Sequence, residues 1–330
     1  MRVVLLGPQR RPTVDAVARS LALDGPVATI TAGWQEREPD DDELSRLLDG
    51  RDINLGLYRR WLDVLDRDGE YAAAERRLQA VLAELQDLYL LRLDHALQAV
   101  YALRRREASP AAEAAEAEAV AAVRDLDTAH LRRVNEARGE FFTGLAPHGR
   151  PVIAGHRAAV TGMLGGAAAL VIAGGHVGVL ADVLHLFNVA PAADAAAVTT
   201  GPGWPVIAWS AGAMALASRI VLFHDRAPQG PGHPEVYGSG LSMVRGVVLL
   251  PHARARLLLG DTARMAVLAS RFAPARCVLL ERGTRLDIGP AAERSGGGPC
   301  PAEKAAGGAP WPPGARVLGM DGRVATLEMA

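Results

Sequence analysis

One serine of this 330-residue chain stands where a nucleophile would stand, at a turn from a buried strand into a helix. The continuous apolar run Pro205 to Ala208 is typical of a strand buried on both faces, and a helix of small residues follows Ser210. Such a turn exposes the serine oxygen and directs the following backbone N–H groups at a developing oxyanion. The same position would suit a simple helix N-cap, which is a common role for serine.

Two later residues could complete a hydrolytic triad with this serine. Asp225 lies 15 residues after Ser210, and His252 lies 27 residues further on, directly after the apolar run Val247 to Pro251. A histidine at a strand end can take the serine proton, and a carboxylate can fix the tautomer of that histidine. Asp225 could instead be a surface turn residue and His252 a hydrogen-bonded residue at the strand end. His224 is a competing histidine.

A second turn with possible chemistry follows the buried run Ala168 to Ala173. Gly174 and Gly175 stand there before His176, and glycine permits positive φ and close approach of the backbone to a ligand. An ordinary strand-to-helix turn and a phosphate-binding turn are the alternatives. The phosphate interpretation is weak, because the sequence has neither a G-x-G-x-x-G motif nor a P-loop lysine.

These segments resemble those of the dipeptidase E and cyanophycinase family of serine peptidases, which have a class I glutamine amidotransferase-like fold. Trp209-Ser210-Ala211-Gly212-Ala213 is similar to the family's nucleophile elbow, Gly-x-Ser-Ala-Gly-Ala, with Ala208 in place of the first glycine. The order Ser, Asp, His is the family's order, and a strand running into Pro-His is how it presents its histidine. Gly174-Gly175 is similar to the family's Gly-Gly-Gly-Asn turn, although Ala173 and His176 differ from it.

The resemblance implies a role for each residue. Ser210 would attack the substrate, His252 would act as base and then acid, and Asp225 would orient His252. The backbone N–H groups of Gly175 and Ala211 would form the oxyanion hole. Contacts with the substrate are expected from three residues: Gly174, His176 and Trp209. The family's substrates imply a short, aspartyl-type peptide, and no cofactor or metal is expected.

Three other functions stay open. A binding or regulatory module that kept the fold and lost turnover is favoured mildly by Ala208, Ala173 and His176. An α/β-hydrolase esterase shares the order Ser, Asp, His, but its acid and histidine usually lie farther down the chain. A cysteine-dependent glutamine amidotransferase is disfavoured, because the elbow carries serine and Cys277 stands inside a predicted strand.

Short apolar runs alternating with helical segments predict a doubly wound α/β domain with a mostly parallel sheet and helices on both faces. This domain is expected to comprise residues 1–40 and 146–330. Segment 290–314, rich in Gly, Pro and Ala, is predicted to be a loop. The predicted strands, in chain order, are Val3 to Leu6, Pro26 to Ile30, Val152 to Ala154, Ala168 to Ala173, Pro205 to Ala208, Arg219 to Phe223, Val247 to Leu250, Cys277 to Leu280, Arg285 to Ile288, Arg316 to Gly319 and Arg323 to Met329.

Residues 41–145 are predicted to form an inserted helical hairpin. Tyr71 to Arg106 contains no Gly or Pro, and its apolar residues from Leu78 to Leu103 recur mostly every three or four residues. Ser109-Pro110 then marks the start of a second long helix. The hairpin is expected to hold no catalytic residue. It would serve as a homodimerisation arm or as a cover over the site, with simple packing on the parent domain as the alternative.

Composition limits the other partners. Formal net charge is −1 and the isoelectric point is about 6.8, so neither nucleic acid nor an anionic membrane is an expected partner. Cys277 and Cys300 are the only cysteines, which is too few for a disulfide framework and favours a reducing compartment. The short apolar N-terminal run lacks a cleavage site for a signal peptide. A cytoplasmic protein is therefore expected, and the family resemblance implies a small peptide as its partner.

Overall fold

The computed structural model describes residues 1–9, 13–201, 203–226, 232–289 and 314–327. Its largest sheet has six strands in the order β10-β1-β5-β4-β2-β3, in which all neighbours are parallel except β10 and β1. The bounds of these strands are Arg2–Leu6 for β1, Val27–Ile30 for β2, Asp52–Asn54 for β3, Ala169–Ile172 for β4, Pro205–Trp209 for β5 and Arg285–Ile288 for β10. The predicted segment 290–314 lies, except for Gly314, outside the described residues, as does Cys300.

Helices cover both faces of this sheet, which explains why its central strands are apolar without interruption. Successive side chains of a strand point to opposite faces. In β4, Leu170 and Ile172 pack in the larger core with helix α6 (Pro151–Gly165), whereas Ala169 and Val171 pack with α1 (Val14–Ser20) and α2 (Asp42–Leu47). Helices α7 (Val177–Leu186) and α8 (Val189–Thr200) also belong to the larger core.

The remaining strands do not continue this sheet. A second sheet has the order β12-β11-β9-β8, and β6 pairs with β7 in a separate two-stranded sheet. Only β8 and β9 are parallel in the second sheet. The prediction of one sheet is therefore wrong, because the strands after β5, except β10, find partners among themselves. The bounds are Ile220–Leu222 for β6, Glu235–Gly238 for β7, Val247–Pro251 for β8, Arg276–Leu280 for β9, Arg316–Leu318 for β11 and Val324–Thr326 for β12.

Two local predictions also need correction. Val152 to Ala154, predicted as a strand, lies in the first turn of α6, where Pro151 occupies the start of the helix and supplies a preset φ. Strands β3 and β7 were not predicted from the sequence. The other helices are η1 (Ala32–Arg37), α3 (Leu57–Arg67), η2 (Pro147–Gly149), α9 (Ala211–Leu216), α10 (Ala253–Arg256) and α11 (Thr262–Phe272).

None of the described helices is by itself long and apolar enough to cross a membrane. One bent pair, α7 with α8 at an angle of 64°, meets the length and composition criteria only when the two are taken together.

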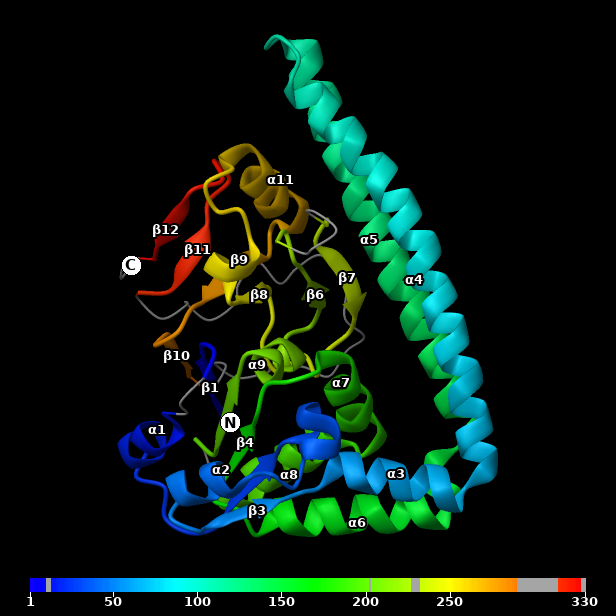
Figure 1. Cartoon of the computed structure of the whole chain (residues 1–330), viewed down its shortest axis with the longest axis vertical. Helices are drawn as coiled ribbons and strands as arrows, with labels where there is room; N and C mark the ends of the chain where they lie inside the picture. Colours follow the sequence, from blue (N-terminus) through cyan, green and yellow to red (C-terminus); the bar gives the residue numbers. More distant parts are fainter. Residues whose placement is uncertain (10–12, 202, 227–231, 290–313, 328–330) are drawn as a thin grey trace.

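The hairpin consists of α4 (Gly69–Arg104) and α5 (Pro110–Leu145), which run side by side along one flank of the molecule and extend beyond it (Figure 1). The side chains of Asp68 and Ser109 cap the two helices by accepting N–H bonds from Tyr71 and Ala112. The insertion therefore begins near residue 69 and not at 41. Residues 42–67 hold α2, β3 and α3, and β3 pairs with β2 as an edge strand of the main sheet.

A buried charge cluster joins the hairpin to the domain. Arg271 of α11 donates two hydrogen bonds to the carboxylate of Asp127 in α5, each 2.7 Å long, and a third to the hydroxyl of Tyr89 in α4. The Arg271 and Asp127 side chains are 2% and 0% exposed. Tyr89 in turn accepts the N–H of Val236 in β7, and the His130 ring stacks on Tyr89 with centroids 4.0 Å apart. The hairpin thus packs on its parent domain, as in the simplest of the predicted alternatives.

We expect the Asp127→Asn variant to lose about 3 to 5 kcal/mol of its free energy of unfolding, because it leaves the buried Arg271 guanidinium without a counter-charge. Urea denaturation would measure the loss. The matched control is Glu136→Gln on the same helix, which breaks the exposed Glu136–Arg132 pair and should cost less than about 1 kcal/mol. Equal losses in the two variants would contradict the role of the cluster.

Candidate active site

Ser210 occupies the turn between β5 and α9 with φ 52° and ψ −120°, a conformation that is strained for any residue with a side chain. The neighbouring backbone is close. A Cβ on Gly212 would lie 2.4 Å from the carbonyl oxygen of Ile172, so only glycine fits after this turn. Ala208, where the resembling family has glycine, is fully buried in β5, and the turn closes with alanine there.

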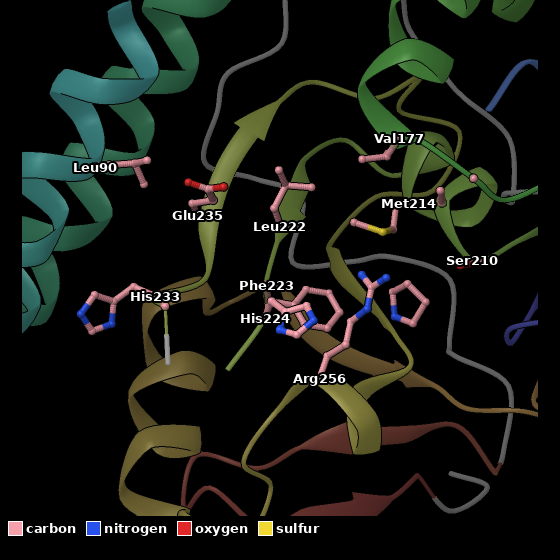
Figure 2. A pocket seen from close by; sticks show the side chains of 14 residues that line it. Leu90, Val177, Ser210, Met214, Leu222, Phe223, His224, His233, Glu235 and Arg256 are labelled. Carbon is pink, nitrogen blue, oxygen red and sulfur yellow. The ribbon is translucent and has the colours of Figure 1, made fainter. Parts of the chain in front are cut away.

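A pocket of about 480 Å³ opens beside Ser210. Ser210 and Arg256 lie on one side of it, whereas Leu90 from α4 lies on the other side with His233 and Glu235 (Figure 2). The hairpin therefore supplies part of the pocket wall. Its contribution is the apolar side chain of Leu90, and the cover over the site stays a prediction.

The glycine turn lies against the same pocket. Gly175 has φ 128°, and a Cβ there would come within 2.2 Å of the carbonyl oxygen of Gly33, so the turn requires glycine. Both Gly175 and Ala211 line the pocket. Within the described part of the chain neither backbone N–H has an acceptor, so both are free to donate to a ligand.

Gly174, His176 and Trp209 are not among the residues that line the pocket, and their substrate contacts stay a prediction. A Cβ on Gly174 would lie 2.9 Å from the Ser210 Cβ, and this glycine makes room for the serine. The His176 Nδ1 accepts the N–H of Val179 and caps α7. Trp209 is 5% exposed and packs in the core on the α1 and α2 face of the sheet.

His252 follows β8 with φ 58°, and its backbone N–H donates to Leu280 at the end of β9. Since β8 and β9 are parallel and pair Pro251 with Leu280, His252 and Glu281 leave the same edge of the sheet together. Glu281 accepts the Arg254 N–H at 2.7 Å, which holds its carboxylate over the turn that starts at His252. Burial and then the Arg256 guanidinium lower the pKa of His252, while the Glu281 carboxylate acts in the opposite direction.

Asp225, predicted to orient His252, is engaged elsewhere. Its carboxylate pairs with Arg264 at 2.6 Å and accepts the Leu258 N–H at 3.0 Å, and the side chain is fully buried. A buried carboxylate needs partners of this kind. Asp225 therefore fastens the segment after β6 to the loop after α10, and no described hydrogen bond joins it to His252.

Two histidines compete as the base. His224 lines the pocket, whereas His252 follows directly after Pro251, which also lines it. No hydrogen bond joins the Ser210 hydroxyl to either ring among the described residues. Helix α9, which begins after Ser210, contacts β8, which ends before His252, so the two elements that carry them are neighbours.

Arg256, which lines the pocket, and Glu281, which lies beside the turn that starts at His252, were not predicted from the sequence. Glu281 has a readable signal, because it follows the buried run Cys277 to Leu280 just as His252 follows its own strand. Arg256 has none, being one of several arginines in that stretch. Its guanidinium carbon lies 6.0 Å from the centre of the Phe223 ring, and burial lowers its pKa. No described carboxylate pairs with it.

The chain is similar to a solved structure, a peptidase from an acI-B1 actinobacterium, with 13% sequence identity and a TM-score of 0.40. The similarity covers 87% of this chain and 83% of that one. No protein-family model matches the sequence, and no curated protein matches it. A TM-score of this size does not establish a shared fold, so a functional proposal has to rest on the geometry of the site.

Proposed function

We propose that the protein is a serine hydrolase of the peptidase type and that Ser210 is its nucleophile. The observation that carries the proposal is the strained turn at Ser210, which stands beside a pocket of about 480 Å³. Strain of this kind at a surface-accessible side chain is a common mark of a functional site. The Ser210 oxygen would attack a carbonyl carbon while its proton passes to a histidine, which then protonates the leaving amine. Water would then attack the carbonyl carbon of the acyl-enzyme while the histidine takes its proton, and the histidine would return that proton to the Ser210 oxygen as the acid leaves.

His252 is the proposed base, and Glu281 is proposed to orient it in place of Asp225. A carboxylate beside the histidine ring stabilises the imidazolium that forms when the serine proton is taken. Glu281 is one strand away from His252 at the same sheet edge, whereas Asp225 already has Arg264 and a backbone N–H as partners. The two free N–H groups of Gly175 and Ala211 form the proposed oxyanion hole.

The pocket supports a substrate with a negative charge near the bond that is cleaved. Arg256 lies on the Ser210 side of the pocket and has no carboxylate partner among the described residues (Figure 2). A partly buried guanidinium without a counter-ion is a good receptor for a carboxylate, which it can bind through two parallel hydrogen bonds. This agrees with the short aspartyl peptide that the family resemblance implies.

Labelling by a fluorophosphonate probe tests the nucleophile directly. We expect a single adduct on Ser210, found by peptide mass mapping, and no adduct in the Ser210→Ala variant. Absence of labelling in the wild-type protein, under conditions in which a known serine hydrolase reacts, would overturn the proposal. Comparison of peptide and ester substrates then separates a peptidase from an esterase.

We expect the Arg256→Met variant to lose about 10- to 100-fold in kcat/KM for a peptide with an aspartyl acyl group, since hydrogen bonds to charged groups contribute about 1.5 to 3 kcal/mol. The same change should matter little for the asparaginyl analogue, which carries no charge. Arg254→Met is the matched control, because Arg254 is exposed and does not line the pocket. Equal losses for both peptides would contradict recognition of the carboxylate.

A binding module without turnover is the second candidate. It is favoured by one observation: no described hydrogen bond joins the Ser210 hydroxyl to His252 or His224. Catalytic hydrogen bonds are often long before the substrate binds, so the observation agrees with an enzyme as well. Binding of an acidic peptide without hydrolysis, together with no labelling of Ser210, would favour the module.

A further inference from the structure

The outer face of α4 is apolar and lies open to solvent. Val81, Leu88 and Leu91 are 44%, 52% and 60% exposed, and the spacing in the sequence had predicted one apolar helical stripe that includes them. The structure divides that stripe between two faces. Leu78, Leu93 and Val100 point inward to the core. Val81, Leu88 and Leu91 lie on the outside and follow one another at intervals of seven and three residues.

The hairpin itself cannot cover this face. Both helices contact the domain: α5 packs against α11 and β7, while α4 places Tyr89 against Arg271 and Leu90 in the pocket wall. Val81, Leu88 and Leu91 remain exposed on the other face of α4. Three large apolar side chains along one exposed helix face are unusual for a surface that stays in water, and such patches commonly mark an interface.

Charges beside the stripe specify what would cover it. Glu84 and Arg92 lie four residues before and four residues after Leu88, both are exposed, and neither has an ion-pair partner among the described residues. If a second α4 packs antiparallel with Leu88 on the two-fold axis, each Glu84 faces the Arg92 of the other helix. A parallel pair would instead place Glu84 against Glu84 and Arg92 against Arg92.

We infer that α4 binds the α4 of a second copy of this chain, antiparallel, with Leu88 on the two-fold axis. This interface is isologous and closed, because each contact occurs twice and no face is left for a third copy. Leu91 packs against Leu85, which is half-buried, and Val81 against His95 of the opposite helix. No residue of this interface lines the pocket beside Ser210, so the inference is independent of the proposed function.

Sedimentation velocity over a hundredfold range of protein concentration, about the range that separates weak from stable dimers, tests the inference on the full chain. We expect a dimer for the wild-type protein. Glu84→Arg and Arg92→Glu should each raise the dissociation constant at least about tenfold, because each creates two like-charge contacts. The double variant E84R/R92E exchanges the two charges and should restore the dimer to within about threefold of wild type, as expected when a pair interaction is rebuilt.

Arg76→Glu is the matched control for charge, since Arg76 is exposed on α4 but lies off the apolar stripe, and it should dimerise like the wild type. Circular dichroism and thermal unfolding should show that every variant is folded. A wild-type protein that is monomeric at all concentrations would overturn the inference, as would a double variant no better than the single ones. The rate of fluorophosphonate labelling should be unchanged in all of them, so that a failed dimer and a failed nucleophile are recognised separately.

Discussion

Replacing Ser210 with alanine is expected to lower kcat by about 10⁴- to 10⁶-fold, which is the usual effect of removing the nucleophile of a triad. The remaining rate would come from the oxyanion donors Gly175 and Ala211 and from binding alone. The free energy of unfolding should change by less than about 0.5 kcal/mol, because Ser210 is only partly buried and its hydroxyl has no described hydrogen-bond partner. Steady-state kinetics and urea denaturation of the same preparation would measure both quantities.

Ser242→Ala is a suitable control for this experiment. Ser242 also has a positive φ, 55°, and is also partly buried, but it does not line the pocket. It therefore tests the removal of a hydroxyl from a strained serine without removing a nucleophile, and the variant should keep wild-type kinetics. Unchanged hydrolysis in Ser210→Ala would rule out the proposed nucleophile and leave the binding module as the better description.

The second large effect is expected at His252. We expect His252→Asn to reduce kcat/KM by about 10²- to 10⁴-fold, the usual contribution of a positioned general base. Asparagine is chosen because it tolerates the left-handed conformation that His252 adopts, so the backbone strain stays similar. His224→Asn, which changes the competing histidine of the pocket, should lose less than about tenfold, as expected for a residue that touches the substrate without transferring its proton.

The pH dependence of kcat/KM gives an independent check on His252. A general base must be neutral, so activity falls as pH decreases through the pKa of the base. Since burial and Arg256 lower the pKa of His252 from its ordinary value of 6.5, the acid limb of the profile should have its midpoint below 6.5. Arg256→Met removes one of the causes that lower this pKa and should move that midpoint upward. A larger loss in His224→Asn than in His252→Asn would transfer the role of base to His224.

Glu281 and Asp225 can be separated in the same assay. We expect Glu281→Gln to reduce kcat/KM more than Asp225→Asn, because only Glu281 leaves the sheet edge beside His252. Asp225→Asn should act mainly on stability, since it leaves Arg264 without its buried counter-charge. A result with the opposite order, activity lost in Asp225→Asn and kept in Glu281→Gln, would return the aspartate to the triad.

Much of the fold was readable from the sequence because it depends on local patterns. The continuous apolar runs that became β1, β2, β4 and β5 are dictated by burial on both faces of a parallel sheet. The small residues around Ser210 are dictated by the contact of Gly212 with the carbonyl of Ile172, which leaves no room for a side chain. The absence of Gly and Pro from Tyr71 to Arg106 predicted a long helix, and Ser109 with Pro110 predicted the start of the next one.

Only the tertiary structure decided which of these elements meet. The apolar run of a strand does not show which strand it pairs with, so the division into three sheets was not predicted. For the same reason the sequence did not predict that His252 and Glu281 leave the sheet at the same edge. Spacing brought Asp225 into the predicted triad, but a buried carboxylate pairs with the nearest cation in space, and that cation is Arg264, 39 residues away. The two faces of α4 were likewise indistinguishable by periodicity, because what separates Leu78 from Leu88 is the position of the core against which the hairpin packs.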